Sequence, residues 1–180
     1  LQWPAPGAPA VAARARALLA DAGIASAGDD RRGYDHGVFV PFLIVDPAAA
    51  IPVATLSLRA DLDPAFHIAV GRALAPLRDE GVAIIGSGMS YHHLRHFFDG
   101  DGRTSVPFDA WLTAAATAAP DARDAALTDW KRAPNAIDCH PRAEHLLPLM
   151  VVAGAAGADR GRRDFHDRIG GKAVSGYRYG

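Results

Sequence analysis

Residues 81–98, GVAIIGSGMSYHHLRHFF, constrain the fold more than any other part of this 180-residue chain. Residues 82–85 are apolar without alternation, which is typical of a strand that is buried on both faces of a sheet. A Gly-Ser-Gly turn at residues 86–88 then ends the strand. Ligands of open α/β sheets bind beyond the carboxyl ends of the strands, so this turn marks a candidate site.

The rest of the chain predicts helices and strands in alternation. Residues 51–58 resemble a strand, and residues 63–77 resemble a helix that opens with Asp63-Pro64. Followed by the strand at 82–85, this order predicts an α/β fold with a central, mostly parallel or mixed sheet flanked by helices. Residues 38–45 are apolar, and their periodicity leaves strand and helix both open. Further helices are expected at residues 10–22, 105–119, 121–131 and 142–157, and a short closing strand is expected at 173–180.

Composition narrows the class of partner. The formal net charge is −1 and charged residues make up 22% of the chain, so no basic surface for nucleic acid is indicated. Cys139 is the only cysteine, which excludes an intrachain disulfide and a cysteine-based zinc site. The mainly apolar run at residues 146–158 contains a proline and is too short to span a bilayer. We therefore expect one cytoplasmic domain whose partner is neither nucleic acid nor a membrane, with its oligomeric state left open.

Three histidines follow the glycine turn, at positions 92, 93 and 96. Imidazole titrates near neutral pH and binds metals, so His92 suits a metal ligand or a general acid/base. The segment lacks a glycine needed for a dinucleotide fingerprint, a glycine needed for a nucleophile elbow, and the glutamate of a zincin helix. Neighbours in an extended segment point to opposite sides, so His92 and His93 are not expected to share a site. His93 and His96 are interpreted as surface residues.

A second cluster, CHPRAEHLLPL, spans residues 139–149. Glu144 and His145 stand at the start of the expected apolar helix, where neighbouring side chains diverge by about 100°. Only one of them can then face a given metal ion. Glu144 could be an ordinary first-turn acid favoured by the helix dipole, whereas His145 on an apolar helix favours a functional role. His140 is expected on a loop surface.

The remaining histidines lie elsewhere. Asp35 and His36, flanked by glycines in RGYDHGVFVPF, fit a carboxylate–histidine pair and a polar turn equally well. His67 lies within an amphipathic helix and His166 in a charged C-terminal segment, and both are interpreted as structural.

Taken together, these phrases resemble the DODA-type, LigB-like (class III) extradiol aromatic ring-opening dioxygenases. The resemblance covers essentially the whole chain in family order. It rests on WPAPGAPAVAARARALL, RGYDHGVFVPF, IPVATLSL, GRALAPLRDEGVAIIGSG, HPRAEHLLPLMVVAGAAG and GKAVSGYRYG. Six ordered matches are far more specific than any single one.

The resemblance implies a single catalytic domain over residues 1–180 that inserts O2 into a catechol-type substrate and opens the ring. It implies a mononuclear non-haem metal, Fe(II) or Zn(II), with His145 and His92 as its ligands and Glu144 as the fallback for His145. His92 matches the family's catalytic histidine after the G-S-G turn, as an acid/base beside the metal or as a further ligand. His36 matches the pocket histidine of the DHG phrase. The implied partners are a small aromatic diol and O2.

Two departures from the family pattern qualify this resemblance. Tyr91 and His93 flank His92 where the family usually has threonine or valine and asparagine. The family also has two metal-binding histidines before the PAPG phrase, whereas this chain starts at Leu1 directly before it. We therefore expect the N-terminal metal-binding strands to be missing, and residues 1–180 alone to hold a metal weakly or to be inactive.

Two other functions compete with the dioxygenase. The chain could be a non-catalytic or truncated ligand-binding domain with the same fold. It could also be a metal-dependent hydrolase in which His92 and His145 activate water.

Overall fold

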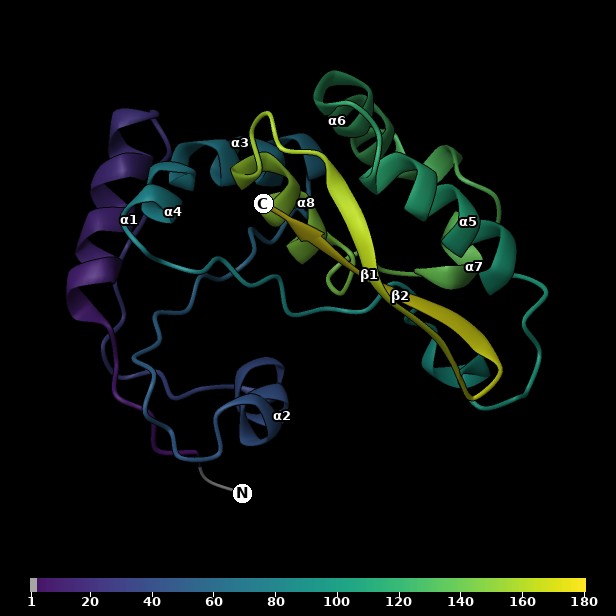
Figure 1. The fold of residues 1–180 in the computed structure, drawn as a ribbon, viewed down its shortest axis with the longest axis horizontal. Helices are drawn as coiled ribbons and strands as arrows, with labels where there is room; N and C mark the ends of the chain where they lie inside the picture. Colours follow the sequence, from purple (N-terminus) through teal and green to yellow (C-terminus); the bar gives the residue numbers. More distant parts are fainter. Residues whose placement is uncertain (1–2) are drawn as a thin grey trace. The chain divides into compact units, whose positions relative to one another are not determined.

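The computed structural model describes residues 3–180, and their contacts divide the chain into two compact units (Figure 1). The first contains the chain up to Ser57 together with Pro76–Ala83, and the second contains Leu58–Ala75 and Ile84–Gly180. Each unit is described by itself below. The single catalytic domain expected from the sequence stays a prediction.

The first unit is built around the buried indole of Trp3. Its Nε1 donates to the carbonyl of Asp46 at 2.8 Å, and its ring packs against Tyr34 and Phe42 with centroids 5.6 and 4.9 Å away. The helices of this unit are α1 (Pro9–Asp21), α2 (His36–Val45) and the single turn α4 (Pro76–Asp79). Helix α1 confirms the helix expected at residues 10–22.

The apolar residues 38–45, which the sequence left open, form most of helix α2. Asp35 is the N-cap, because its carboxylate accepts a hydrogen bond from the N–H of Gly37 at 3.1 Å. The helix contains Pro41 and has no buried residue, and Ile44 is 83% exposed. The continuous apolar run therefore reflects neither a buried strand nor a buried helix in the described chain.

The second unit holds most of the hydrophobic core, which includes Phe108, Leu112, Trp130, Leu147 and Met150. Its elements are α3 (Pro64–Leu74), α5 (Ser105–Ala116), α6 (Pro120–Thr128), α7 (Ala136–Cys139), α8 (Leu147–Ala155), the 3-10 turns Leu94–His96 and Trp130–Arg132, and strands β1 (Gly161–Ile169) and β2 (Lys172–Tyr179). The helices expected near 63–77, 105–119 and 121–131 are confirmed, each with slightly shorter bounds.

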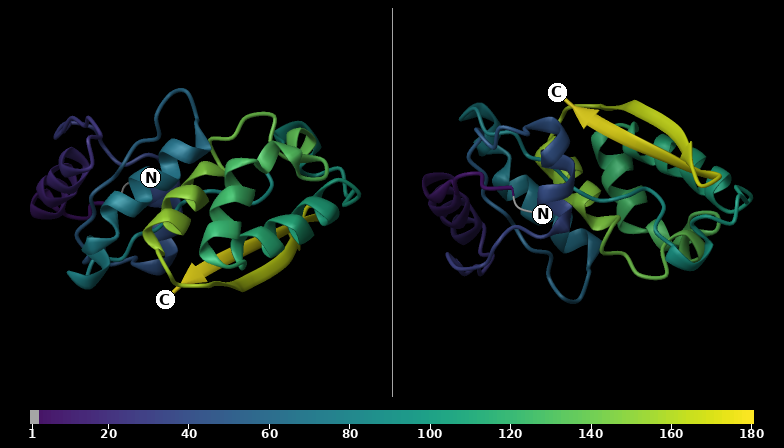
Figure 2. Two further views of the ribbon diagram at one scale, coloured as in Figure 1. Left: turned by 90° about the horizontal axis from the view of Figure 1, so that it is seen from above. Right: turned by 90° about the horizontal axis from the view of Figure 1, so that it is seen from below.

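Helices α3 and α8 pack side by side because a glycine on each allows the backbones to touch (Figure 2). A Cβ atom on Gly71 would collide with the carbonyl of Val151, and one on Gly154 would collide with the carbonyl of Ile68. Asp63 caps α3 through the N–H of Ala65 at 3.0 Å, and Pro64 occupies its first turn, as the Asp-Pro opener predicts.

The predicted central parallel sheet is not observed in residues 3–180, whose only sheet is the antiparallel pair β1–β2. Of the strand expected at 51–58, only Val53 forms a parallel bridge, with Gly7. The strand expected at 82–85 is extended without ladder pairing, and Ile85 is 63% exposed. A β-strand requires a hydrogen-bonded neighbour, and apart from the bridge at Val53 no described segment pairs with these two runs.

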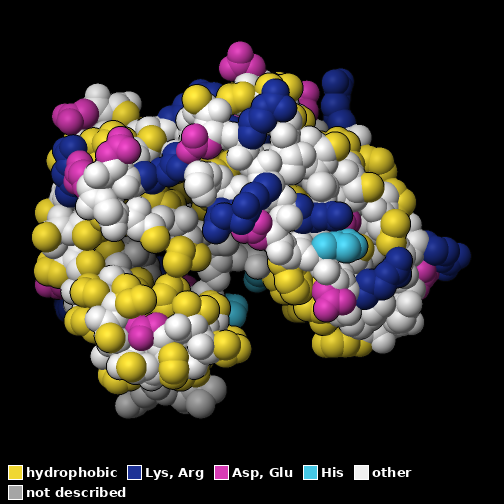
Figure 3. All heavy atoms as spheres, viewed as in Figure 1, with side chains coloured by type: hydrophobic (Ala, Val, Ile, Leu, Met, Phe, Trp, Pro, Cys, Tyr) yellow, Lys and Arg dark blue, Asp and Glu magenta, His cyan; other side chains and the backbone are white. Residues whose placement is uncertain are grey.

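The C-terminal hairpin corrects a second expectation, since the charged segment preceding β2 is itself a strand. Its register runs from Gly161 opposite Tyr179 to Ile169 opposite Lys172. The turn uses Gly170 and Gly171 at φ of 57° and 85°, a region that glycine adopts without strain. Strand β1, GRRDFHDRI, is exposed along most of its length and carries both arginines and aspartates, and Figure 3 shows basic and acidic side chains together over the hairpin. Because its composition is polar, the sequence of this segment gives no signal of a strand.

Among the described residues, no helix has the length and hydrophobicity needed to cross a lipid bilayer.

Replacing Gly154 with alanine tests the contact between α3 and α8. In a free helix this change is stabilising by about 1 kcal/mol, but here the new methyl meets backbone, so we expect a loss of at least about 2 kcal/mol. Urea unfolding followed by circular dichroism measures it. Gly176→Ala is the matched control, because its Cβ would lie at an ordinary 3.4 Å from Phe165. Equal stability of the two variants would contradict the close approach.

The thiol of Cys139 gives a second test. Burial raises the pKa of Cys139 to about 12, with a further contribution from the nearby Asp138 carboxylate. The reactive thiolate is therefore scarce at pH 8, and the native protein should resist iodoacetamide, whereas urea-unfolded protein should react fully. Mass spectrometry after timed labelling measures both rates. Rapid labelling of the native state would show that residues 136–139 open readily.

Candidate functional site

The segment that carries His92 is held against the chain that leads into α8. The N–H of Met89 donates to the carbonyl of His145 at 2.9 Å, and the N–H of His92 donates to the carbonyl of Cys139 at 3.0 Å. A Cβ atom on Gly86 or Gly88 would collide with the carbonyls of Pro148 or His145. The glycines of the predicted turn are therefore required because two backbones touch there.

These contacts bring two of the predicted site residues together. The rings of His92 and His145 are stacked, with centroids 3.4 Å apart and planes inclined by 15°. The two residues are 53 positions apart in the chain. Both are partly exposed, with 28% of the His145 side chain accessible, so a small molecule can reach the rings.

Glu144 joins the same cluster, which corrects the expectation that a helix would turn it away from His145. Helix α8 begins only at Leu147, so residues 144 and 145 lie in a turn. Nδ1 of His145 and Oε1 of Glu144 are 3.3 Å apart. Burial alone would raise the pKa of Glu144, but hydrogen bonds from its own N–H and from His145 outweigh burial and lower the pKa. The carboxylate form is thus favoured.

The donor atoms of this cluster suit a divalent cation. One ligand atom each from His92, Glu144 and His145 lie within 4.8 Å of one another. Ligands at about 2.0–2.2 Å from one ion are at most about 4.4 Å apart, so the spacing of these atoms is close to that of a metal site. Oε2 of Glu144 is buried and has no hydrogen bond among the described residues, although the Nε of Arg142 forms an ion pair with it at 3.4 Å. Two imidazoles and one carboxylate are a donor set that Fe(II) and Zn(II) accept.

His36 belongs to the first unit, where it is exposed in the first turn of α2. Asp35 caps that helix and forms an ion pair with Arg32 at 3.5 Å. His92 and His145 belong to the second unit, so the convergence of His36 with them stays a prediction.

His93 and His96 lie together outside the cluster. Nδ1 of His93 is 2.9 Å from the carbonyl of Asp138, and the His93 ring meets the His96 ring edge-on at 4.6 Å. His96 also lies 3.3 Å from a carboxylate oxygen of Asp99. Consecutive residues 92 and 93 thus engage different partners, as the extended backbone predicts.

Three other histidines have structural surroundings. His67 is buried, and its ring nitrogens contact the carbonyl of Asp63 at 2.6 Å and the N–H of Arg59 at 3.1 Å. His166 lies on β1, 3.1 Å from the hydroxyl of Ser175. His140 is fully buried rather than on a loop surface as expected. Its position before Pro141 carries no sequence signal of burial, because packing against distant residues decides it.

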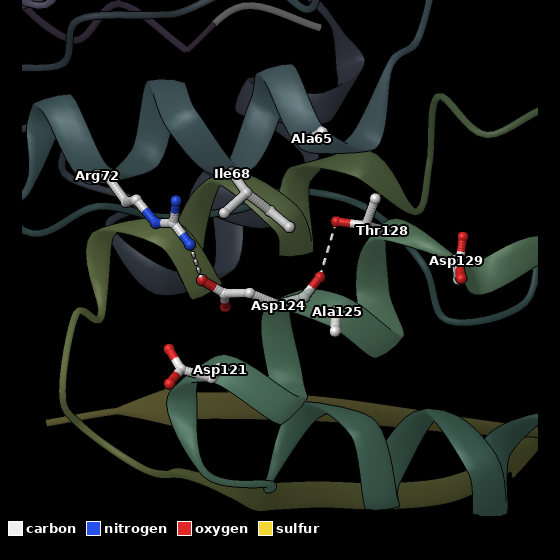
Figure 4. Close-up of a pocket in the computed structure, with 8 residues that line it drawn as sticks. All are labelled: Ala65, Ile68, Arg72, Asp121, Asp124, Ala125, Thr128 and Asp129. Carbon is white, nitrogen blue, oxygen red and sulfur yellow. Dashed lines mark hydrogen bonds and ion pairs between the residues drawn. The ribbon is translucent and has the colours of Figure 1, made fainter.

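A surface depression of about 420 Å³ lies between α3 and α6, away from this cluster's residues (Figure 4). Arg72 and Asp124 form an ion pair at 2.6 Å across it. None of the predicted site residues lines it.

Comparison with known proteins adds independent information. Residues 1–175 match the family described as the catalytic LigB subunit of aromatic ring-opening dioxygenase. The chain is 39% identical over 178 residues to the 4,5-DOPA dioxygenase extradiol of Beta vulgaris, covering 97% of the chain and 66% of that protein. It is 42% identical over 173 residues to the protein of the same name from Portulaca grandiflora, covering 87% of the chain and 59% of that relative.

The fold agrees with these matches. The crystal structure of an uncharacterized protein from Escherichia coli K12 superposes with a TM-score of 0.86 at 30% identity, covering 98% of this chain and 75% of that one. The chain spans about 59% to 66% of the length of the two plant relatives. By sequence and by fold, the chain belongs to the LigB family of extradiol, DODA-like aromatic ring-opening dioxygenases.

Proposed function

We propose that the protein containing this chain is an extradiol dioxygenase that opens the ring of a small dihydroxy-aromatic substrate with O2. The observation that carries the proposal is the stacked pair His92–His145 with Glu144 beside it, in a member of the LigB family. The names of the plant relatives favour a catechol related to DOPA as substrate.

We propose His145 as a metal ligand of this chain, with His92 next to the ion and Glu144 on the far side of the His145 ring. If Nδ1 of His145 donates to Glu144 across their 3.3 Å contact, Nε2 keeps a lone pair for the ion, a common arrangement in metal sites. Fe(II) is proposed for turnover, since Zn(II) would fill the same site without activating oxygen. When bound, the metal would hold the diol oxygens and O2 next to each other and make the hydroxyl groups more acidic.

His92 is proposed as the acid/base. Its ring is stacked at 3.4 Å on His145, which places an imidazole nitrogen beside the proposed metal position, where the diol would be held. It would accept a hydroxyl proton of the diol and return that proton later in the reaction. His36 is proposed to orient the substrate, as the family resemblance implies.

The measurements described below also distinguish two alternative functions from the dioxygenase. A non-catalytic binding domain of this fold would bind a catechol without consuming oxygen. A metal-dependent hydrolase would use the same two imidazoles without any need for O2.

Oxygen consumption tests the function directly. The Fe(II)-reconstituted protein that contains this chain, offered a panel of catechols including DOPA, should consume O2 and form a yellow ring-opened product. His92→Ala should lower kcat by at least about 100-fold, the contribution typical of a general acid/base. His93→Ala is the matched control and should retain turnover, since its ring faces Asp138 and His96. Equal loss in both variants would remove His92 from the chemistry.

Zinc binding tests the metal assignment separately. Calorimetric titration of the protein with Zn(II) should show affinity lowered at least about tenfold by His145→Ala and also lowered by Glu144→Gln. His96→Ala provides the control, because it also removes an imidazole, but one that lies outside the cluster. Unchanged affinity in the His145 variant would place the ion elsewhere.

A further inference from the structure

His140 has surroundings that suit a fixed, neutral ring. It is fully buried, with the rings of Phe108 and Trp130 at centroid distances of 5.3 and 6.0 Å. Burial lowers the pKa of His140 to about 4, so the ring is uncharged near neutral pH. A buried neutral imidazole is rigid when one of its nitrogens has a definite partner.

That partner identifies the tautomer. Nε2 of His140 lies 3.0 Å from the backbone carbonyl of Ser90. A carbonyl oxygen only accepts, so Nε2 carries the proton and donates it. Nδ1 is then the unprotonated nitrogen, and it has no hydrogen bond to the described residues.

The hydrogen bond acts on the segment that carries His92. Ser90 precedes His92 by two residues, and the neighbour of His140, Cys139, accepts the N–H of His92 at 3.0 Å. The hydroxyl of Ser90 in turn accepts the N–H of Ser175 on β2 at 2.8 Å. Residues 90–92 are therefore fixed on one side by 139–140 and on another by the C-terminal strand.

We propose that His140 is a positioning residue, whose Nε2–H bond to the Ser90 carbonyl sets the ring of His92 against His145 and Glu144. His140 contacts backbone and takes no part in the reaction. The inference deepens the proposed function, because it assigns a residue that keeps the acid/base and the metal-binding cluster in register.

Nuclear magnetic resonance of the metal-free protein tests the positioning without relying on activity. Long-range nitrogen–proton spectra of the imidazoles should show His140 as the Nε2–H tautomer, with a slowly exchanging proton. In the wild type, the ring signals of His92 and His145 should carry the mutual ring-current shift of a stacked pair. An Nδ1–H tautomer for His140 would overturn the proposal without any variant.

Variants then separate the hydrogen bond from packing. His140→Leu keeps apolar volume and removes the donor, so the ring-current shifts of His92 and His145 should be lost. His140→Gln places an amide N–H near the Nε2 position and should restore them in large part. If the leucine variant does not fold, His140→Asn, whose amide is too short to reach Ser90, takes its place in the comparison.

The control is His67→Leu, which removes another buried histidine that bonds only local backbone. It should lower the melting temperature while leaving the His92 and His145 signals unchanged. Zn(II) affinity should fall roughly tenfold in the leucine variant at position 140 and recover in the glutamine variant. Wild-type ring signals in His140→Leu would overturn the positioning role. Absence of zinc binding in the wild-type protein that contains this chain would instead reject the proposed function and leave the ring-signal result standing.

Discussion

The hydrogen bonds between residues 89–92 and residues 139–145 are the constraint on which the candidate site depends. Two backbone bonds and one bond from the buried His140 ring join segments about fifty residues apart in the sequence. Each bond contributes only about 1 kcal/mol, but together they set the register of one segment against the other. A shift by one residue would exchange His92 for its neighbour and separate the stacked imidazoles. The positions of the His92 and His145 rings are therefore set by main-chain hydrogen bonds rather than by attraction between the rings.

The charges of the cluster favour a cation at this place. Glu144 is held as a carboxylate close to two imidazoles, and besides His145 it forms an ion pair with the largely exposed Arg142. An exposed ion pair contributes little, so Arg142 can give way to a stronger cation at low cost. A divalent ion bound by His145 would place positive charge close to the Glu144 carboxylate, whose buried Oε2 has no hydrogen bond among the described residues. Packing alone does not require a carboxylate and two imidazoles at this place, whereas cation binding does.

Predictions from the sequence succeed where the structure depends on local interactions, and they fail where it depends on contacts between distant segments. Helices at 64–74, 105–116 and 120–128 are recognisable because their signals, an Asp-Pro opener, a proline start and an apolar period, are local. The strands expected at 51–58 and 82–85 fail because pairing requires a distant partner, and β1 is missed because its exposed face is polar. For the candidate site, the glycine turn and the family phrases predict His92 and His145, whose rings lie together in the structure. The turn geometry of Glu144 and the burial of His140 depend on contacts between distant segments, so no local pattern could reveal them.

The terminal segment GKAVSGYRYG contains strand β2, and the hydrogen bonds of this strand explain several of its residues. Lys172 is almost fully buried and donates to Asp99 at 2.6 Å and to the carbonyl of Asp101, which ties the loop after the histidines to the hairpin. Further along β2, Ser175 donates to Ser90, and the hydroxyl of Tyr179 donates to the end of α5 at Ala116. A buried ammonium is tolerated only where it is paired, so the loop at 99–101 must keep its shape for β2 to dock. The last residues of the chain thus fix the backbone on both sides of His92, through Ser90 before it and Asp99 and Asp101 after it.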